Sequence, residues 1–464
     1  MNTSEIYQQE IICALATPSG VGAIAVIRVS GLGSIALVNS VFKGKDLEKA
    51  ESHTVHFGTI NSTTDTSDAQ PFAAEVIDEV LVTVFKTPRS FTKEDSVEIS
   101  CHGSDYIIRQ ILKLLIQKGA RIAKPGEFTQ RAFLNGQFDL VQAEAVADLI
   151  AADSEASHRT ALNHLRGGFS KKLASLRTEL IHFASLIELE LDFGEEDVEF
   201  AQRDDLKRLI EALLNTIEPL IDSFDFGNAV KEGVPVAIIG SPNVGKSTLL
   251  NSLLNEEKAI VTSIAGTTRD VIEDTIVLDG LKFRFIDTAG IRETTDLVES
   301  IGIERSKDAM EKADIVIFLF DSEETLKENQ QLAALLSDDK HILFVLNKID
   351  ISQALPEESL GECEILPISA KNQIGLKALT DKLVSLVHSQ SATDTVVTNL
   401  RHYEHLLKTQ EALTDVLHGL ATGITGDFLA QDIRLSLHHL GEITGTIVTD
   451  DLLENIFRKF CIGK

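Results

Sequence analysis

The stretch VAIIGSPNVGKST, residues 236–248, constrains this chain more than any other part of its sequence. An apolar, strand-like run leads into a glycine-rich turn, and LLNSLL continues as a helix-like run directly afterwards. In a phosphate-binding loop, glycines let backbone N–H groups turn toward phosphate oxygens, and the N-terminus of the next helix adds partial positive charge. The alternative is a glycine-rich turn that arose by chance. Such a turn would not need a strand-like run before it and a helix-like run after it. The order predicts a phosphate-binding loop in an α/β domain.

Residues in and after this loop have the chemistry that a nucleoside triphosphate requires. Lys246 would reach the outer phosphates, and the Ser247 hydroxyl would bind magnesium. In FRFIDTAG, Asp287 ends a strand where its carboxylate can hold the magnesium shell, and the N–H of Gly290 can sense the terminal phosphate. Thr268, in AGTTRD, offers a second magnesium ligand in a switch loop.

Residues further along the chain are predicted to recognise the base of the nucleotide. ILFVLNKID ends a strand with Asn347, Lys348 and Asp350. A carboxylate accepts two parallel hydrogen bonds from the ring and exocyclic N–H groups of guanine, a pattern that adenine does not offer. A base without those donors would leave the acceptor unpaired. PISAKN supplies the run 369–371 to cover the base. The sequence therefore predicts GTP as the nucleotide.

From about residue 233 to 388 the chain resembles a Ras-like GTPase domain of the translation-factor-related class. After DTAG, Ras-like enzymes carry a glutamine that orients the attacking water, whereas this chain has Ile291, so another group must position the water. Arg269 and Arg292 are candidate arginine fingers. Switch-loop arginines are, however, more often surface or partner contacts.

Asn243, inside the phosphate-binding loop, has two interpretations. Its amide oxygen, joined by backbone carbonyls of a switch loop, would make a hard-oxygen site for a monovalent cation such as potassium. That ion would neutralise the charge that an arginine finger stabilises elsewhere. Alternatively, the side chain bonds the backbone of its own loop. The residues alone favour neither interpretation.

Composition limits the other functions. The 464 residues suggest about three domains, and no apolar run approaches the roughly 20 residues of a membrane span. The N-terminus MNTSEIYQQE lacks the pattern of a secretory signal, so we expect a cytoplasmic protein with no membrane partner. Because the net charge is −28, an RNA partner requires a local basic patch or a second, more basic protein.

Cysteine and histidine do not indicate a metal site. The four cysteines are far apart and form no CxxC pair: Cys13, Cys101, Cys363 and Cys461. We expect reduced thiols. His402 and His405 lie three residues apart on an expected helix, and His438 and His439 are adjacent. Since no cysteine or carboxylate cluster completes a set, we predict exposed helix histidines rather than ligands.

The periodicity changes three times along the chain. Short β-type runs at 23–31, 53–60, 79–88 and 95–103 indicate a mixed α/β domain, and long runs with helical spacing follow. Buried-strand periodicity then holds to about residue 388, after which helical spacing returns. We therefore expect α/β domains plus an all-α domain: an N-terminal α/β domain at 1–137, a discontinuous helical domain at 138–231 and 391–464, and an inserted P-loop GTPase domain at 232–390.

The flanks carry a more specific resemblance. ATPSGVGAIAVIRVSG, RSFTKEDSVEISCHG and KPGEFTQRAFLNGQFDLVQAEAVADLI precede the GTPase segment, and the chain ends in FRKFCIGK. Over essentially its whole length the chain resembles the MnmE (TrmE) family of tRNA-modification GTPases. Ribosome-assembly GTPases share PNVGKS but append a KH module or a second GTPase domain, and neither pattern is visible here. A GTP-dependent ribosome-assembly switch protein is the alternative function.

The family resemblance implies a fuller activity. The N-terminal domain binds folate and dimerises, and the homodimer works with an FAD-dependent MnmG-like partner in a heterotetramer or larger complex. Together they add an aminomethyl or carboxymethylaminomethyl group to carbon five of the tRNA wobble uridine. Formyl- or methylene-tetrahydrofolate supplies the one-carbon unit, and potassium-dependent pairing of two GTPase domains activates hydrolysis.

The resemblance also implies roles for single residues. Glu299, in LVESIGIER, orients the hydrolytic water through another water and acts with Lys246 and Gly290, although by itself it reads as a solvated helix carboxylate. The magnesium ligands are Ser247 and Thr268. The potassium ligands are Asn243, Thr262, Ile264 and Thr267. The residues around the nucleotide are Asn243, Val244, Gly245, Lys246, Ser247, Thr248, Thr262, Ser263, Ile264, Ala265, Gly266, Thr267, Thr268, Asp287, Thr288, Ala289, Gly290, Asn347, Lys348, Asp350, Ser369, Ala370 and Lys371.

For folate, the resemblance implies four residues: Arg28, Glu98, Gln137 and Lys464. Glu98 can accept from the pterin ring, and cations suit the glutamate tail; at 137 many relatives have lysine. A strand-surface arginine is the alternative for Arg28. For Cys461 the alternatives are a buried helix-end thiol and a role near the folate chemistry, because CIGK fits a prenylation box poorly.

Overall fold

A computed structural model describes residues 10–62, 75–192, 203–255, 274–286, 307–337, 340–351, 364–388 and 396–463. By spatial proximity of its Cα atoms the chain divides into two units, residues 1–147 with 441–464 and residues 148–440. Both divisions fall inside continuous helices, α5 (Leu140–Ala151) and α16 (Gly426–Thr444).

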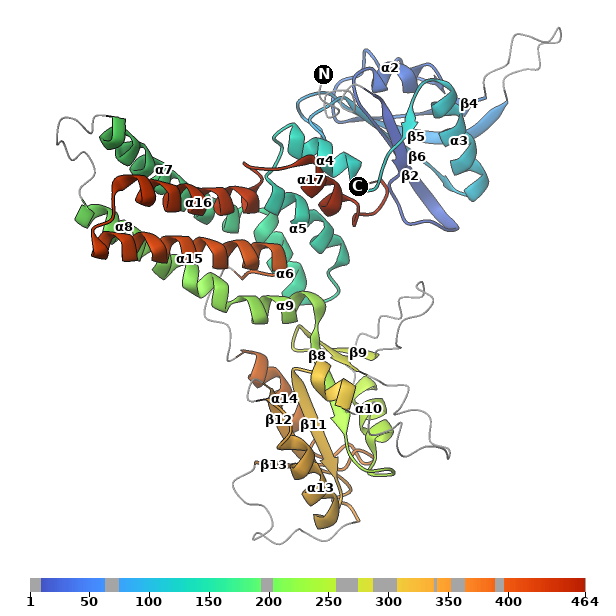
Figure 1. Cartoon of the computed structure of the whole chain (residues 1–464). Coiled ribbons are helices and arrows are strands. Elements are labelled where there is room, and N and C mark those ends of the chain that lie inside the picture. The colour runs from blue at the N-terminus through green and yellow to red at the C-terminus, as the bar shows by residue number, and fades with distance from the viewer. Residues whose placement is uncertain are drawn as a thin grey trace. The chain divides into compact units, whose positions relative to one another are not determined.

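The first unit is built on a seven-stranded sheet in the order β3-β4-β5-β6-β2-β1-β7 (Figure 1). Neighbouring strands are antiparallel except β1 and β7, which run parallel. The strands are β1 (Ile12–Leu15), β2 (Gly22–Ser30), β3 (Phe42–Lys43), β4 (Thr54–Asn61), β5 (Val76–Phe85), β6 (Ser96–Gly103) and β7 (Arg121–Ile122).

Alternation along the strands separates a core face from an outer face. In β5, Val80, Val82 and Val84 are buried, whereas Glu79 and Leu81, at alternate positions, are exposed, as the two-residue period of a strand requires. The core face is covered in part by α3, whose buried residues include Ile108, Ile111, Leu114 and Leu115. The helices of this unit besides α5 are α2 (Ser34–Asn39), α3 (Asp105–Gln117), α4 (Glu127–Leu134) and α17 (Asp450–Phe457).

The C-terminal helix belongs to this unit. Phe457 of α17 lies 6.5 Å, ring to ring, from Phe133 of α4. Gly126, which precedes α4 with φ +67°, donates its N–H to the carbonyl of Cys461 at 3.3 Å, and a Cβ there would meet the Phe457 carbonyl at 2.5 Å. Only glycine allows this approach. The last residues of the chain therefore lie against the start of α4.

Long helices make up one part of the second unit. Figure 1 shows α7, α8, α15 and α16 running alongside one another. On α8, Leu206, Ile210, Leu213, Ile217 and Leu220 are buried, at the three- and four-residue spacing of a helix with one apolar face. Besides α16, the helices here are α6 (Glu155–Leu165), α7 (Gly168–Asp192), α8 (Arg203–Asp222), α9 (Phe224–Glu232) and α15 (Leu400–Thr422).

A six-stranded sheet forms the other part of the second unit, in the order β13-β12-β11-β8-β10-β9. All neighbours are parallel except the β9–β10 hairpin. The strands are β8 (Val234–Ile239), β9 (Asp274–Leu278), β10 (Leu281–Phe285), β11 (Ile315–Phe320), β12 (His341–Leu346) and β13 (Ile365–Pro367). Among the residues that the structure describes here, the helices are α10 (Lys246–Leu254), α13 (Glu323–Ala333) and α14 (Leu376–His388).

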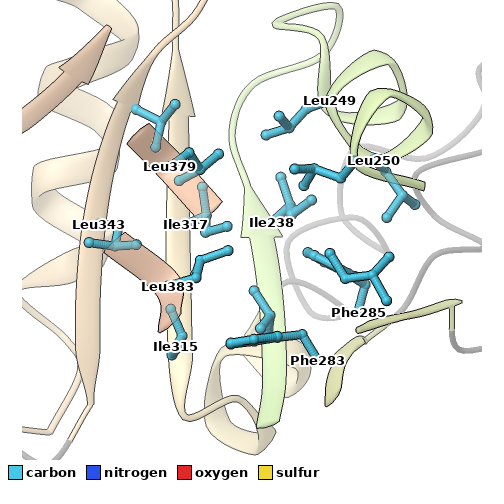
Figure 2. Close-up of a cluster of buried hydrophobic side chains, with 14 of the residues drawn as sticks. Ile238, Leu249, Leu250, Phe283, Phe285, Ile315, Ile317, Leu343, Leu379 and Leu383 are labelled. Atoms are coloured by element: carbon cyan, nitrogen blue, oxygen red, sulfur yellow. The ribbon is translucent and has the colours of Figure 1, made fainter. Parts of the chain in front are cut away.

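Helices cover both faces of this sheet, so its central strand β11, IVIFLF, is buried at every position. Figure 2 shows Ile238, Ile315 and Ile317 from the central strands meeting leucines of α10 and α14. On the opposite face, Phe318 and Phe320 pack with a cluster that includes Leu326 of α13. This burial fixes the strand ends, and with them the loops that follow.

The α/β and all-α fold class predicted from periodicity is confirmed. The predicted runs at 23–31, 53–60, 79–88 and 95–103 correspond to β2, β4, β5 and β6. The domain division at 137, 231 and 390 stays a prediction. Across the ranges that the structure describes, no helix combines the length and apolar character needed to cross a bilayer.

Candidate functional site

The phosphate-binding loop runs from the end of β8 at Ile239 to the start of α10 at Lys246. Gly245, at the N-terminus of α10, has φ +107°, and a Cβ there would lie 2.3 Å from the Asn347 amide nitrogen. Gly240 has its own restriction, because a Cβ would meet the Leu319 carbonyl at 2.3 Å. Both glycines are therefore required by the packing of the loop.

Lys246 is held within this loop. Its Nζ donates to the carbonyls of Gly240 at 2.6 Å and Ser241 at 3.1 Å. Burial lowers the pKa of Lys246, because the charged form loses solvation. Gly245 has no side chain with which to cap α10, so the partial positive charge of the helix N-terminus stays directed at the loop. This arrangement suits an anion such as a phosphate.

Asn243 lies in the same loop with φ +63° and an exposed side chain. Asparagine tolerates this left-handed backbone better than most residues. Among the described residues the carboxamide makes no hydrogen bond, so the alternative in which it bonds its own loop backbone is not the arrangement seen. Its oxygen is accessible to a ligand from solvent.

Asn347, after β12, ties the phosphate loop to the base loop. Its amide nitrogen donates to the Val244 carbonyl at 2.8 Å, and its amide oxygen accepts from the Ala370 N–H at 3.0 Å. The side chain is 3% exposed. From α10, the Ser252 hydroxyl donates to the Ala370 carbonyl at 2.7 Å. One carboxamide therefore sets the separation between the two loops.

Asp350 is exposed at the edge of this arrangement. The Ser369 hydroxyl donates to its Oδ1 at 2.6 Å, and this hydrogen bond holds the pKa of Asp350 below its usual value. Lys348 has φ +64° and pairs with Asp321 at 2.6 Å. An ionised carboxylate fixed in this way can accept two hydrogen bonds from a guanine edge. Thr248 and Lys371 are both exposed beside these loops.

The structure thus brings together the predicted residues of the loops 240–248, 347–350 and 369–371. Ser247 is half-buried in the first turn of α10. Other predicted residues lie outside the described ranges: Thr262, Ser263, Ile264, Ala265, Gly266, Thr267, Thr268, Asp287, Thr288, Ala289, Gly290, Glu299 and Lys464.

In the first unit, Arg28 of β2 and Glu98 of β6 are direct cross-strand neighbours. Arg28 donates to Glu98 Oε1 from Nε at 3.0 Å and from Nη2 at 2.8 Å. Both bonds end on Oε1, so Oε2 accepts no bond from the described part of the chain. The side chains are 18% and 28% exposed, which keeps the pair accessible to a ligand.

Two aromatic rings that sequence reasoning missed flank this pair. The Arg28 guanidinium lies 5.2 Å from the ring centroid of Phe91 and 5.7 Å from that of Phe128, within the range of cation–π attraction. Phe91 lies in the motif RSFTKEDSVEISCHG and Phe128 in KPGEFTQRAF. Their place in these motifs was the sequence signal that could have identified them as site residues. The two rings extend the candidate site beyond its charged pair.

A buried ionic network anchors α4, which carries Phe128. Glu127 accepts from Arg121 at 2.7 and 2.9 Å and from Arg131 at 3.1 Å. Burial alone would raise the pKa of Glu127, but hydrogen bonds from Arg121 and the Lys124 N–H, with the nearby charge of Arg131, outweigh it and lower that pKa. The ionised network fixes the helix beside the Arg28–Glu98 pair.

The other residues predicted near the folate are Gln137 and those at the C-terminus. Gln137 is exposed, with its backbone N–H bonded to the Ala132 carbonyl at 2.8 Å. Near the C-terminus, Gly463 lies against β1, where a Cβ would meet the Leu15 carbonyl at 2.1 Å. Cys461 is an exposed free thiol, so the buried-thiol alternative is wrong.

The prediction of exposed helix histidines is wrong for three of the four. His402 is buried at 2% exposure, whereas His438 is exposed as predicted. His405 and His439 are half-buried and meet each other.

Family profiles and full-length relatives match this chain. A family profile described as the GTP-binding protein TrmE N-terminus matches residues 11–137, and one described as the MnmE helical domain matches residues 140–461. A curated relative from Cytophaga hutchinsonii, named tRNA modification GTPase MnmE, is 54% identical over 473 residues, covering 100% of both chains. A relative of the same name from Flavobacterium johnsoniae is 52% identical over 479 residues, covering 99% of this chain and 100% of its own.

A solved structure of the FeoB G-domain from Methanococcus jannaschii is 27% identical, with a TM-score of 0.24. It covers 33% of this chain and 96% of that chain.

The substitution Ser369→Ala tests the base site. It removes the hydroxyl that orients Asp350, so we expect affinity for GTP to fall by roughly three- to tenfold, the usual effect of losing one ordinary hydrogen bond. Isothermal titration of the nucleotide-free chain measures this. Ser385→Ala is the control, because that exposed hydroxyl donates to a carbonyl of its own helix at 2.7 Å. Equal affinity in both variants would remove Ser369 from the site.

Proposed function

This chain belongs to the MnmE (TrmE) family of tRNA modification GTPases, and we propose that it uses GTP hydrolysis to drive folate-dependent modification of the wobble uridine. It is a GTPase that acts in tRNA modification. The finer proposal is that the chain, with an FAD-dependent MnmG-like protein, adds an aminomethyl or carboxymethylaminomethyl group to carbon five of that uridine. The Arg28–Glu98 pair, in the same chain as a nucleotide site, carries this proposal.

In the GTPase site, the chain's own residues bind and orient the nucleotide. Lys246 and the N-terminus of α10 attract the phosphates, and Asp350 selects guanine. Ser247, with Thr268 from the switch loop, would hold magnesium, which supplies charge neutralisation at the phosphate oxygens when bound. The half-buried hydroxyl of Ser247 in the first turn of α10 fits that role.

Potassium is proposed as the second ion. The exposed Asn243 carboxamide in the phosphate loop, without a hydrogen bond from the described residues, supports a free oxygen ligand there. Thr262, Ile264 and Thr267 would complete the set. The ion supplies positive charge beside the transferred phosphate, the contribution that an arginine finger makes in other GTPases.

Water positioning is assigned to Glu299. Ile291 occupies the place of the usual glutamine, and an apolar side chain cannot orient a water molecule. Glu299, acting through a second water, is proposed to fill this vacancy, together with Lys246 and the N–H of Gly290 at the phosphates.

A reduced folate is proposed to bind at the Arg28–Glu98 pair. Oε2 of Glu98 can accept from the N–H groups of a pterin, while Arg28 holds Oε1. The rings of Phe91 and Phe128 would offer apolar contact to a flat heterocycle. Gln137 and Lys464 are proposed to lie near the glutamate tail.

A homodimer is proposed through the N-terminal domain. The outer face of its sheet exposes Phe57 at 66%, Val55 at 57% and Leu81 at 48%, and Phe57 is the direct cross-strand neighbour of Leu81. Contiguous apolar side chains on one sheet face support burial against a partner. This face also carries Arg28 and Glu98, so a second copy would lie close to the folate site.

The remaining parts of the proposal concern domains, partners and compartment. We propose domains at 1–137, 138–231 with 391–464, and 232–390, in a cytoplasmic complex that binds tRNA. The net charge of −28 supports a second, more basic protein that helps to hold the RNA.

The proposed role of potassium predicts that GTP hydrolysis slows when the ion or its ligand Asn243 is replaced. Replacing potassium by sodium, or Asn243 by alanine, should lower the steady-state rate of GTP hydrolysis by on the order of tenfold or more, because charge stabilisation at the phosphates is lost. Asn251→Ala, at an exposed position of α10, is the control and should keep the potassium response. Unchanged turnover in both tests would exclude the cation mechanism.

The folate role separates this function from a ribosome-assembly switch. Titration of the full chain with 5-formyltetrahydrofolate should show binding that Glu98→Gln and Arg28→Ala weaken by roughly tenfold or more. Arg109→Ala, at an exposed position of α3, is the control. Mass spectrometry of wobble uridines from cells lacking the chain should show the unmodified base. Absence of folate binding, with GTP-dependent binding to ribosomal subunits, would favour the alternative.

A further inference from the structure

Residues 156–178, which run from the first turn of α6 into α7, differ in charge from the rest of this acidic chain. The chain has 71 aspartate and glutamate residues among 464, and none of them lies in this run. The run does contain five lysines and arginines, here called the basic cluster: Arg159, Arg166, Lys171, Lys172 and Arg177. Against a net charge of −28, the basic cluster is a local reversal of sign.

Folding turns the basic cluster toward solvent. On α6, Ala161 and His164 are buried, whereas Arg159 and Arg166 are exposed. These two arginines are seven residues apart, so they share one side of the helix and lie roughly 10 Å apart along its axis. On α7 the buried residues recur at helical spacing, and Lys171 lies on the opposite, exposed side.

The charges of the basic cluster are not neutralised within the chain. Its five cations form no ion pair with any residue that the structure describes. On the neighbouring helix α8, by contrast, Lys207 pairs with Glu211 at 3.9 Å, and Arg208 pairs with Asp205. The cations of α6 and α7 therefore keep their charge for a ligand from outside.

The turn between the two helices concentrates this charge. Arg166 ends α6, and only Gly167 separates it from the start of α7. Lys171 and Lys172 follow soon after, in a helix that has no acidic residue in its first turn. The positive end of the helix dipole disfavours cations at this place, so the two lysines reduce the stability of the helix. The same combination of lysines and a helix N-terminus attracts a phosphate group.

We propose that the basic cluster binds the phosphate backbone of the tRNA substrate. This inference rests on the proposed function, because it locates the RNA on a chain that acts in tRNA modification. Phosphates repeat along a strand, so a row of unpaired cations can contact them without reading the bases. Such contacts would hold and orient the tRNA, while the choice of the wobble base is made elsewhere.

The residues between the cations favour RNA over an acidic protein as the partner. On α7, the exposed positions beside Lys171 are small or polar: Ala174, Ser175 and Thr178. The centre of a protein–protein interface is instead enriched in aromatic and other apolar side chains. Because the rest of the chain is acidic and repels a polyanion, the basic cluster would also determine which side of the helices the tRNA approaches.

The test measures binding of an unmodified tRNA transcript to the full chain by fluorescence anisotropy, without nucleotide, over a series of sodium chloride concentrations. Arg166→Ala combined with Lys171→Ala should weaken binding by roughly fivefold or more at low salt. The slope of log affinity against log salt should fall by about 1.5, since two phosphate contacts are lost. Arg166→Lys combined with Lys171→Arg keeps both charges and should bind like the native chain.

Lys377→Ala combined with Lys408→Ala is the matched control. Both lysines are exposed and lie outside the basic cluster, so this variant makes the same change in net charge. It should bind tRNA as the native chain does. Circular dichroism and steady-state GTP hydrolysis, which we expect to be unchanged, check that each variant is folded.

Three outcomes would overturn the proposal. The native chain could bind no tRNA at low salt, or the Arg166→Ala, Lys171→Ala variant could bind it as tightly as the native chain. That variant could also keep its affinity for tRNA and lose affinity for the FAD-dependent partner, which would make the basic cluster a protein contact. The proposed function is judged separately, by the wobble uridines of cells lacking the chain, so it could stand after any of these results.

Discussion

The nucleotide site depends on one buried carboxamide, that of Asn347. It accepts from the base loop at Ala370 and donates to the phosphate loop at Val244, so the two loops keep one separation. Because the side chain is buried, loss of either bond would leave a polar group unpaired in the interior. Asp350 and Lys246 occupy useful positions only while this connection holds. The asparagine of the base motif is therefore first a structural element and then part of recognition.

In both sheets the pairing of the strands positions the candidate functional residues. In the six-stranded sheet, the phosphate loop follows β8 and the base loop follows β12, and burial on both faces fixes these parallel strands. In the seven-stranded sheet, antiparallel register sets Arg28 opposite Glu98. One face of that sheet is buried in a core while the other carries the charged pair and exposed apolar residues. Each sheet thus uses its core to hold a different chemistry in place.

Local chemistry explains what could be predicted from the sequence. Gly245 and Lys246 stand at fixed spacing because a phosphate loop needs them there, and the longer strands show their periodicity. The short strands β1, β3 and β7 contain too few residues to show one. Phe91 and Phe128 approach Arg28 only after folding. Such contacts between distant segments leave no local pattern, and neither does the burial of His402.

The central claim is that Asp350, held in register by Asn347, reads guanine through its carboxylate. The most direct measurement compares hydrolysis of GTP and XTP by the native chain and by Asp350→Asn. Xanthine presents a carbonyl where guanine presents an amino group, so an amide N–H in place of the carboxylate should prefer it. The account predicts that the native chain selects GTP and the variant selects XTP. A variant that still selects GTP would contradict it, because guanine would then be read by another group.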